Sequence, residues 1–241
     1  MARTVIVTGA SRGIGYAVAA GFAAAGEQVL ITGRHQEAIE AAAAALGPGV
    51  TAAVCDASDP AAVEALGLVL PATVDVLVNN AGGNTDFGRP APRDLKELAE
   101  AWHANLDANL VSAVLMTTAT EPRLAHGGAV ISIGSIAADK GAGSYGAAKA
   151  AIASWNAGLA AELGPRDITA NVVSPGYIED TEFFQGRLTD QRREALIAAT
   201  CNGRPGTPHD IAGTVLFLAS PAARHVTGQV IAVNGGARTT R

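Results

Sequence analysis

Apolar positions along the chain fall into two alternating patterns. Short apolar, β-branched runs are too short for helices and apolar at nearly every position, which is typical of strands covered on both faces. These runs are 4–8, 29–32, 51–55, 74–78, 129–133, 169–173 and 229–233. Ala-rich stretches with helical periodicity lie between them, at 14–25, 35–46, 94–118, 145–163, 189–199 and 209–219. The alternation predicts an α/β fold, a doubly wound sheet of seven parallel strands with right-handed crossovers and helices on both faces.

We expect one domain, 1–241, because no linker, repeat or break in composition divides the chain. With 49% hydrophobic but only 4% aromatic residues and 28 glycines, the core must consist of small side chains. The longest segment without a predicted element is 174–188, rich in Pro, Gly and aromatic residues. It is predicted to be a loop that covers a site, a lid.

Charge and cysteine content favour a protein that handles small molecules in a reducing compartment. The net charge of -5 is mild and spread along the chain, so no nucleic-acid groove or basic membrane face is expected. Cys55 and Cys201 lack metal-ligand spacing, and the five histidines show no ligand grouping, so no metal is expected. The chain starts with a strand-like run in place of a signal peptide, and we expect a cytoplasmic location.

A glycine-rich turn, "VTGASRGIG" (7–15), follows the first strand and opens the first helix. A phosphate there would meet unpaired backbone N–H groups and the positive end of a helix dipole. Gly9 suits the tight turn, Gly13 the close approach of backbone to a pyrophosphate, and Gly15 the packing of helix on strand. The turn predicts a dinucleotide site, the alternative being a glycine turn with no ligand.

The end of the second strand, "ITGRH", indicates which dinucleotide would bind. NAD-binding folds place a carboxylate there for the ribose 2′-OH, and none is present. Arg34 offers a planar fork for a 2′-phosphate, with Arg12 as a second cation, so NADP(H) is predicted over NAD. The alternative is that Arg34 only begins an exposed helix.

"SYGAAK" (144–149) sets Tyr145 and Lys149 four positions apart among small residues. In a helix the two side chains share a face, so their polar ends lie close together. A positive charge near a phenol favours the phenolate and so promotes release of the proton. The pair predicts a proton donor, the alternative being an ordinary surface pair.

The order of these motifs resembles that of the short-chain dehydrogenases/reductases along nearly the whole chain. The similar segments are "TGASRGIG" (8–15), "CDASD" (55–59), "NNAG" (79–82), "NL" (109–110), "SIGS" (132–135), "YGAAK" (145–149), "SPGYIEDT" (174–181) and the tail with "VTGQVIAVNGG". The resemblance implies a Rossmann-type fold, and overall similarity is greatest to 3-oxoacyl-acyl-carrier-protein reductases.

The resemblance implies a catalytic tetrad of Asn109, Ser135, Tyr145 and Lys149. Tyr145 would be the general acid/base, Lys149 would lower its pKa and hold the ribose, Ser135 would bind the substrate oxygen, and Asn109 would hold a water. Asn105 is close enough in sequence to be confused with Asn109.

The family usually has about thirteen residues from serine to tyrosine, and here Ser135 precedes Tyr145 by ten. Ser132 has the usual spacing and is a rival, but it lies inside an apolar run where its side chain would be buried in the sheet. Ligands bind at the carboxyl ends of strands, so Ser135 is preferred. The loop between them would be shortened.

Further cofactor contacts are implied by resemblance alone. Ile178 and Thr181 of the lid would meet the nicotinamide, and Phe183 and Phe184 would either lean over the substrate or pack against the lid's own helix. The remaining cofactor-binding candidates are Ser11, Ile14, Asp56, Ala57, Asn79, Ala81, Gly82, Pro175 and Gly176, with Tyr145 and Lys149 also counted.

The sequence therefore predicts an NADPH-dependent oxidoreductase that interconverts a ketone and a secondary alcohol. The alternatives are a non-catalytic NADP-binding sensor and an NAD-dependent alcohol dehydrogenase of the same family. The resemblance also implies a homotetramer built through helices 94–118 and 145–163, with a second contact at the last helix and strand.

Overall fold

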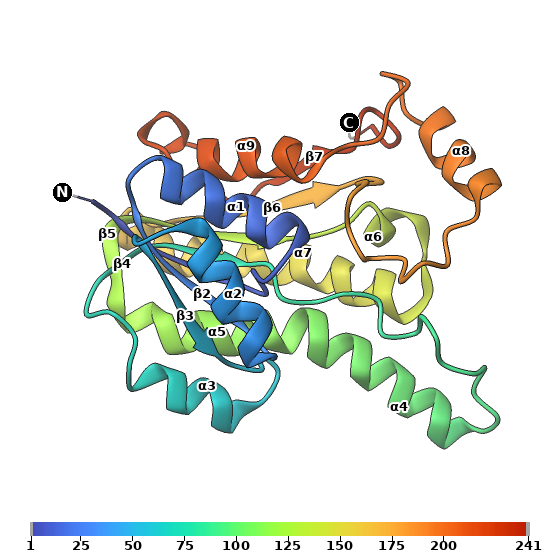
Figure 1. The fold of residues 1–241 in the computed structure, drawn as a ribbon, viewed down its shortest axis with the longest axis horizontal. Helices are drawn as coiled ribbons and strands as arrows, with labels where there is room; N and C mark the ends of the chain where they lie inside the picture. The colour runs from blue at the N-terminus through green and yellow to red at the C-terminus, as the bar shows by residue number, and fades with distance from the viewer. Residues whose placement is uncertain (1, 240–241) are drawn as a thin grey trace.

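The computed structural model describes residues 2–239, which build the predicted parallel sheet (Figure 1). Its seven strands run in the order β3-β2-β1-β4-β5-β6-β7, and every neighbouring pair is parallel. The prediction of the fold class is confirmed. The strands are β1 (Thr4–Thr8), β2 (Gln28–Gly33), β3 (Val50–Val54), β4 (Val74–Asn79), β5 (Leu124–Ile133), β6 (Thr169–Pro175) and β7 (Val230–Val233).

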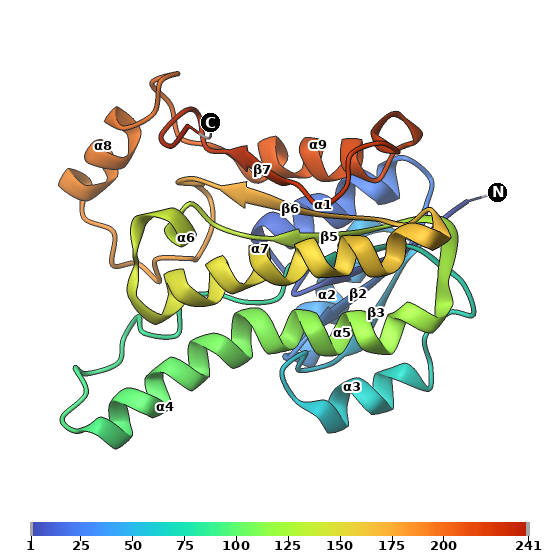
Figure 2. The same cartoon turned by 180° about the vertical axis from the view of Figure 1, so that it is seen from behind.

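Helices cover both faces of the sheet, as Figures 1 and 2 show from opposite sides. One core lies between the sheet and α1 (Gly13–Ala24), α2 (Gln36–Leu46) and α9 (Pro208–Leu218). The other lies beneath α3 (Pro60–Gly67), α5 (Ser112–Thr120) and α7 (Gly143–Leu163). Small and β-branched side chains fill both cores, and Phe22 is the one aromatic residue among the largest fully buried side chains.

Three details of the helices differ from the sequence prediction. The stretch 94–118 is two helices, α4 (Leu95–Leu106) and α5, joined by a π-helical turn, Asp107–Val111. The short helices α3 and α6 (Ala137–Lys140) were not predicted, whereas α8 (Asp190–Ala198) was.

None of the helices in residues 2–239 is long and apolar enough to cross a membrane.

The chain reverses its direction of winding between β3 and β4, so the sheet has a topological switch point beside β1. In open α/β sheets ligands bind beyond the carboxyl ends of the strands at such a point. The glycine turn and the segments after β4, β5 and β6 all leave the sheet at this edge.

Candidate functional site

The glycine turn between β1 and α1 is folded tightly against the end of β4. Gly9 and Gly13 have positive φ angles of 64° and 58°, which glycine adopts without steric penalty. A Cβ on Gly9 would lie 2.8 Å from the Cα of Ala81, and one on Gly15 would lie 2.6 Å from the carbonyl oxygen of Gly9. Asn80 Nδ2 donates to that carbonyl at 2.9 Å. Gly9 and Gly15 therefore let the chain pack against itself around the turn.

The N-terminus of α1 is left free of side-chain caps. Arg12 is the N-cap residue with no side-chain capping bond, and the first turn holds no acidic residue. By contrast, Asp59 and Thr207 cap α3 and α9. Ser11 and Ile14 flank Arg12 in this partly exposed turn. Uncapped N–H groups and the helix dipole suit an anion, so the turn fits a phosphate group.

Arg34 and Asp56, two of the predicted cofactor-binding residues, follow the ends of β2 and β3, and their charges interact. Arg34 is exposed just before α2, and Ala57 is buried one residue after Asp56. Asp56 Oδ1 accepts from the backbone N and the Oγ of Ser58, at 3.0 and 2.7 Å. Burial alone would raise the pKa of Asp56, but these bonds and the charge of Arg34 hold it below its usual value.

The side chain of Asn79 points toward α5 and away from the glycine turn. Its side chain is buried, and Nδ2 donates to Thr117 Oγ1 of α5 at 2.8 Å. Asn80, which the sequence analysis did not select, instead donates to the carbonyl of Thr8, and its backbone N–H bonds Thr8 Oγ1. Alternate residues along a strand point to opposite faces, so a paired Asn-Asn places one amide on each side of β4. Gly82 follows, exposed.

Ser135 lies just past the carboxyl end of β5. The preceding Gly134 is buried, and a Cβ there would lie 2.7 Å from Val172 Cγ1, so the tight exit from the strand needs glycine. Ser135 Oγ accepts from the backbone N of Ala137 at 3.1 Å. That bond occupies an oxygen lone pair and leaves the hydroxyl proton available for donation.

Ser132 lies inside the sheet, where its side chain is 1% exposed. It is paired in register with Asn79 and Val172, and its hydroxyl has no hydrogen-bond partner among the described residues. The shortened loop is closed by α6, which packs on Gly146: a Cβ on Gly146 would lie 2.7 Å from the carbonyl oxygen of Ala137. Of the two serines, Ser135 is the one whose hydrogen bonding influences the pKa of Tyr145.

Tyr145 and Lys149 lie on one face of α7, both buried. Lys149 Nζ donates to the carbonyl of Ile133 at 2.8 Å and lies 5.9 Å from the centroid of the Tyr145 ring. Desolvation lowers the pKa of Lys149 to about 8. Burial raises the pKa of Tyr145 to about 12, although hydrogen bonding with Ser135 opposes this rise.

The influence of Lys149 on Tyr145 stays a prediction for the cofactor-bound enzyme; in this structure desolvation of the phenol sets the direction of its pKa shift. The phenol is 6% exposed, and its desolvation outweighs the other influences on its pKa. The ammonium is engaged by a backbone carbonyl at the end of β5.

Asn109 and Asn105 hold different parts of the segment after β4. Asn109 lies in the π-helical turn, where Oδ1 accepts from the N of Gly83 at 3.0 Å and Nδ2 donates to the oxygen of Gly83 at 2.9 Å. Asn105 accepts from the N of Thr85 at 3.1 Å and donates to Ser144 Oγ at 2.9 Å. Asn109 thus fixes the segment nearest β4, and Asn105 ties it to the residue before the candidate proton donor.

The predicted lid, 174–188, begins with the last two residues of β6 and passes beside the glycine turn. Pro175 ends β6, and a Cβ on Gly176 would lie 2.8 Å from Asn234 Cβ. A Cβ on Gly13 would lie 3.6 Å from Thr181 Cγ2. Arg12, expected beside Arg34, instead forms an exposed ion pair with Glu182 of the lid.

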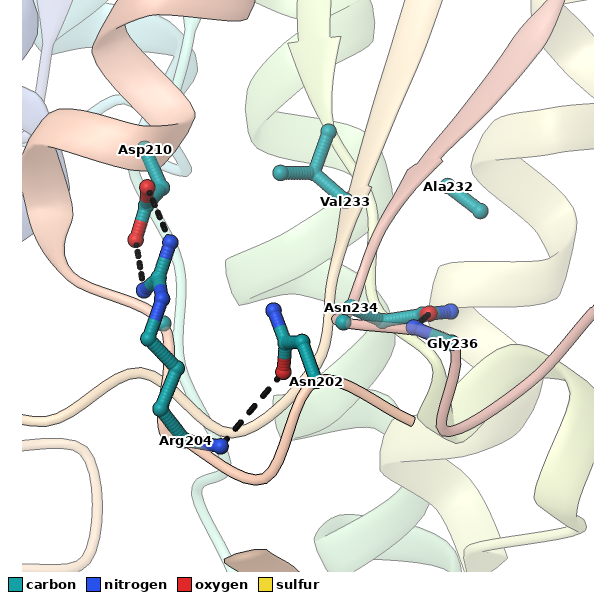
Figure 3. A pocket seen from close by; sticks show the side chains of 9 residues that line it. Asn202, Arg204, Asp210, Ala232, Val233, Asn234 and Gly236 are labelled. Carbon is teal, nitrogen blue, oxygen red and sulfur yellow. Dashed lines mark hydrogen bonds and ion pairs between the residues drawn. The ribbon is translucent and has the colours of Figure 1, made fainter. Parts of the chain in front are cut away.

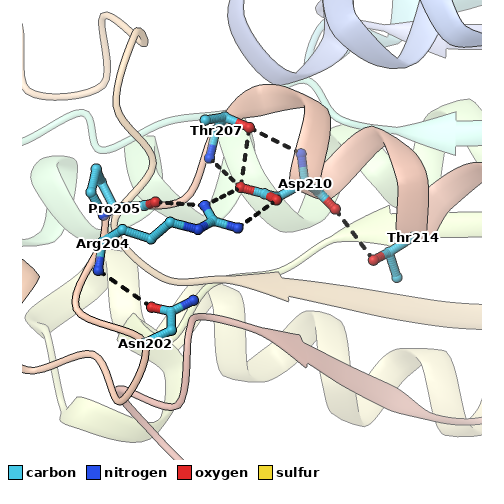
Figure 4. A network of polar contacts seen from close by, with 6 residues as sticks. All are labelled: Asn202, Arg204, Pro205, Thr207, Asp210 and Thr214. Carbon is cyan, nitrogen blue, oxygen red and sulfur yellow. Dashed lines mark hydrogen bonds and ion pairs between the residues drawn. The ribbon is translucent and has the colours of Figure 1, made fainter.

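The base of the lid is held by a bridge between Ile178 and Gly206. The residues on either side of Gly206 in sequence belong to a polar network that includes Arg204, Thr207 and Asp210 (Figure 4). Arg204 binds both carboxylate oxygens of Asp210, at 2.8 and 3.0 Å. Asp210 also accepts from the backbone N of Thr207 at 2.8 Å, which completes the capping box of α9.

A hollow of about 280 Å³ borders this anchor at the end of β7 (Figure 3). Its lining includes Asn202, Arg204 and Asn234. Among the described residues that form it, none belongs to the predicted catalytic set. The hollow is separate from the tyrosine and serine.

An aromatic cluster covers Tyr145, and sequence reasoning found only part of it. Phe183 lies 5.5 Å from Tyr145 and 5.0 Å from Phe184, measured between ring centroids. Phe87 lies 5.5 Å from Phe183, edge to face, and Tyr177 lies 6.0 Å from Phe184. Phe183 therefore lies against Tyr145, whereas Phe184 contacts Phe183, Phe87 and Tyr177. Phe87 was missed because no local pattern connects it to a lid that follows far along the chain.

Comparison with known proteins identifies the class to which this fold and site belong. The family model described as Enoyl-(Acyl carrier protein) reductase matches residues 9–238. The 3-oxoacyl-[acyl-carrier-protein] reductase FabG of Escherichia coli (strain K12) is 36% identical, with 97% of this chain and 96% of that protein covered. The chain belongs to the short-chain dehydrogenase/reductase family and is an oxidoreductase of that family.

Two solved structures agree with this assignment. A short-chain dehydrogenase/reductase from Brucella melitensis superposes with a TM-score of 0.87 at 33% identity, covering 99% of this chain and 97% of that one. A short-chain dehydrogenase from Burkholderia cenocepacia J2315 in complex with NADP has a TM-score of 0.87 at 31% identity, with 98% of both chains covered.

Proposed function

We propose that this protein is an NADPH-dependent reductase that interconverts a ketone and a secondary alcohol. One observation carries the proposal: Tyr145 and Lys149 lie buried on one face of α7, Lys149 Nζ donates to the carbonyl of Ile133, which ends β5, and Ser135 follows two residues later. The similarity to the 3-oxoacyl reductase and to the NADP complex supports the same activity.

The residues at this edge fit a dinucleotide. The uncapped start of α1, with Gly13 at its first position, suits the pyrophosphate, and Asp56 and Ala57 border the adenine side. Lid residues Ile178 and Thr181 would hold the nicotinamide end. The bound nicotinamide supplies the hydride that reduces the carbonyl carbon.

The side chains of this chain supply the proton. Ser135 donates a hydrogen bond to the substrate carbonyl, stabilising the negative charge that develops on oxygen. Tyr145 donates its phenolic proton to the same oxygen, so hydride and proton together convert the ketone into the alcohol. The phenolate left behind is stabilised by Lys149 and regains its proton from solvent; Asn109 positions the segment beside this route.

Replacement of Tyr145 by Phe tests the reductase. NADPH oxidation with a panel of ketones should fall at least about a hundredfold in kcat, the contribution typical of a general acid, with binding of NADPH retained. Equal turnover in the parent and Tyr145→Phe would refute the assigned acid. NADPH binding by a parent protein that reduces no ketone would favour the sensor.

The choice of NADPH rests on Arg34, which is exposed and contributes a positive field beside Asp56. Arg34→Asp should weaken NADP(H) binding by about tenfold or more, because it removes a charged hydrogen bond and adds repulsion. NAD(H) binding should be nearly unchanged. Titration of both dinucleotides by calorimetry measures this, and an equal loss for both would contradict the assignment.

We further propose that residues 1–241 act as one domain in a cytoplasmic homotetramer, with a small carbonyl or alcohol compound as the only other partner. The support is the similarity over nearly the whole chain to a bacterial reductase and the apolar side chains left exposed on α4 and α9.

A further inference from the structure

The aromatic residues of this chain are concentrated over the candidate proton donor. The aromatic cluster, Phe87, Tyr145, Tyr177, Phe183 and Phe184, contains three of the five phenylalanines and two of the three tyrosines. None of these side chains belongs to the three buried core clusters formed by the described residues, in which Phe22 is the one buried aromatic side chain and Tyr16 and Trp155 pack at the margins. Stabilisation of the core therefore does not account for the cluster.

One side of the cluster is a fixed wall. Phe87 follows Asp86, whose Oδ2 accepts from Ser144 Oγ at 2.9 Å, and Ser144 in turn accepts from Asn105 Nδ2. Ser144 and Asn105 are 4% and 0% exposed, and Ser144 immediately precedes Tyr145. The Asn105–Ser144 bond is buried and the Ser144–Asp86 bond is partly buried, and together they hold the segment before Phe87 to the start of α7. Phe87 and Tyr145 are consequently tied to each other through the same short network.

The other side of the cluster is built to move. Phe183 and Phe184 lie in the lid, where all of residues 179–188 are partly or fully exposed. Asp180 and Gln185 have φ angles of 55° and 50°, and the following α8 has no buried residue. The ion pair that holds the lid to Arg12 is exposed, and such pairs contribute little to stability.

The Phe183 ring packs against the Tyr145 ring, and Tyr145 is 6% exposed, so movement of the Phe183 ring opens access to the phenol. The space that the Phe183 ring would leave is bordered by the rings of Phe87, Phe184 and Tyr145. Aromatic rings favour offset or edge-to-face contact with another ring over contact with a saturated group of the same size.

On the basis of the proposed reductase function, we infer that this cluster selects ketones that carry an aromatic ring next to the carbonyl. The ring of the substrate takes the place that Phe183 occupies in the free protein, against Phe87, and Phe183 closes over it from the lid. The preferred substrate class is thus an aryl ketone, and a flexible acyl thioester is a poorer substrate.

The test compares three ketones in NADPH oxidation: acetophenone, cyclohexyl methyl ketone and acetoacetyl-N-acetylcysteamine. The parent should have a kcat/KM about tenfold higher for acetophenone than for the saturated analogue, the effect of one or two ring contacts. Phe87→Leu and Phe183→Leu should each lower that ratio severalfold. Leu68→Ala, at an 86% exposed site outside the cluster, is the control and should leave the ratio unchanged.

The outcomes separate this inference from the function on which it rests. Absence of NADPH oxidation with every ketone would refute the reductase itself. Turnover with equal kcat/KM for acetophenone and cyclohexyl methyl ketone, or a preference for the thioester, would overturn aryl selection and leave the reductase standing. A ratio that Phe87→Leu and Phe183→Leu change no more than Leu68→Ala would also overturn it.

Discussion

Lys149 carries the largest electrostatic cost among the site residues. Its side chain is 5% exposed, yet only one acceptor, the carbonyl of Ile133, is bonded to its ammonium among the described residues. A buried amine with few partners favours its neutral form, and its pKa falls to about 8. An oxidoreductase keeps such a group only if the charge is used, because an apolar side chain would pack there more favourably.

The free energy of unfolding should therefore rise between pH 7.5 and 9.5. In this window folded Lys149 loses its proton while the unfolded lysine, with a pKa near 10.4, keeps it, so the unfolded state binds more protons. The contribution is about 2 kcal/mol on this basis. Denaturant unfolding of the cofactor-free protein at both pH values should show this gain in the parent relative to Lys149→Met.

The comparison between variants isolates Lys149 from Cys55, whose raised pKa of about 11 acts in the opposite direction in both proteins. The raised pKa of Tyr145 costs stability only above about pH 10, where the unfolded phenol ionises first. Lys140→Met, at an exposed lysine, is the matched control and should behave as the parent does. A parallel pH response in the parent and Lys149→Met would contradict a pKa of about 8 for folded Lys149.

At the scale of elements, the anchor of the lid joins a helix cap to the site. Asp210 is the third residue of α9, and its carboxylate accepts from Thr207 and from both terminal nitrogens of Arg204. These hydrogen bonds hold the pKa of Asp210 well below its usual value. The same network fixes Gly206, whose N–H donates to the carbonyl of Tyr177 at 2.9 Å.

Asp210→Ala should lower the free energy of unfolding by about 1 to 2 kcal/mol, the usual effect of losing a helix cap. It should also raise KM for the ketone severalfold, because the base of the lid loses its support. Asp94→Ala removes the cap of α4, where Asp94 accepts from the N of Glu97 at 2.8 Å, and serves as the control. Equal KM values for Asp210→Ala and Asp94→Ala would contradict the idea that the Asp210 network supports the lid.

Elements that depend on local pattern were predictable, and elements that depend on packing were not. The seven strands matched apolar runs, but β5 begins at Leu124, earlier than predicted, because Gly127 and Gly128 interrupt its apolar pattern. Helix α3 is only eight residues long and buries just Val63 and Leu66, so its periodicity is weak. The π-helical turn follows from the bonds of Asn109 to Gly83, a contact that helical periodicity does not reveal.

The whole molecule decides what the sequence left open at the site. Ser135 was favoured over Ser132 by its place at the end of a strand, and the buried position of Ser132 agrees with that argument. Burial raises the pKa of Tyr145 in this structure, and Phe183, which comes from a segment distant in sequence, lies against its ring. Close contacts between residues far apart in sequence are set by the assembled fold. A local sequence motif predicts such contacts only when it resembles that of a known family.

Apolar residues on the surface of the whole molecule indicate how copies of the chain would associate. Leu95, Leu98 and Trp102 of α4 are 83%, 43% and 42% exposed, and their spacing places them on one helix face. On the opposite side of the sheet, Phe217 of α9 and Val230 of β7 are 49% and 42% exposed. A large exposed apolar patch is unusual unless a partner covers it. Two separate patches suit the two interfaces of a tetramer with dihedral symmetry.

Light scattering of the parent at micromolar concentration should give four times the mass of one chain. Trp102→Glu should give half of that mass, since a charge in one interface leaves the second intact, and addition of Phe217→Glu should release single chains. Leu68→Glu, at an 86% exposed site after α3, introduces the same charge outside both patches and should remain a tetramer. A parent with the mass of one chain would contradict the tetramer, and a tetrameric Trp102→Glu would exclude the α4 face as an interface.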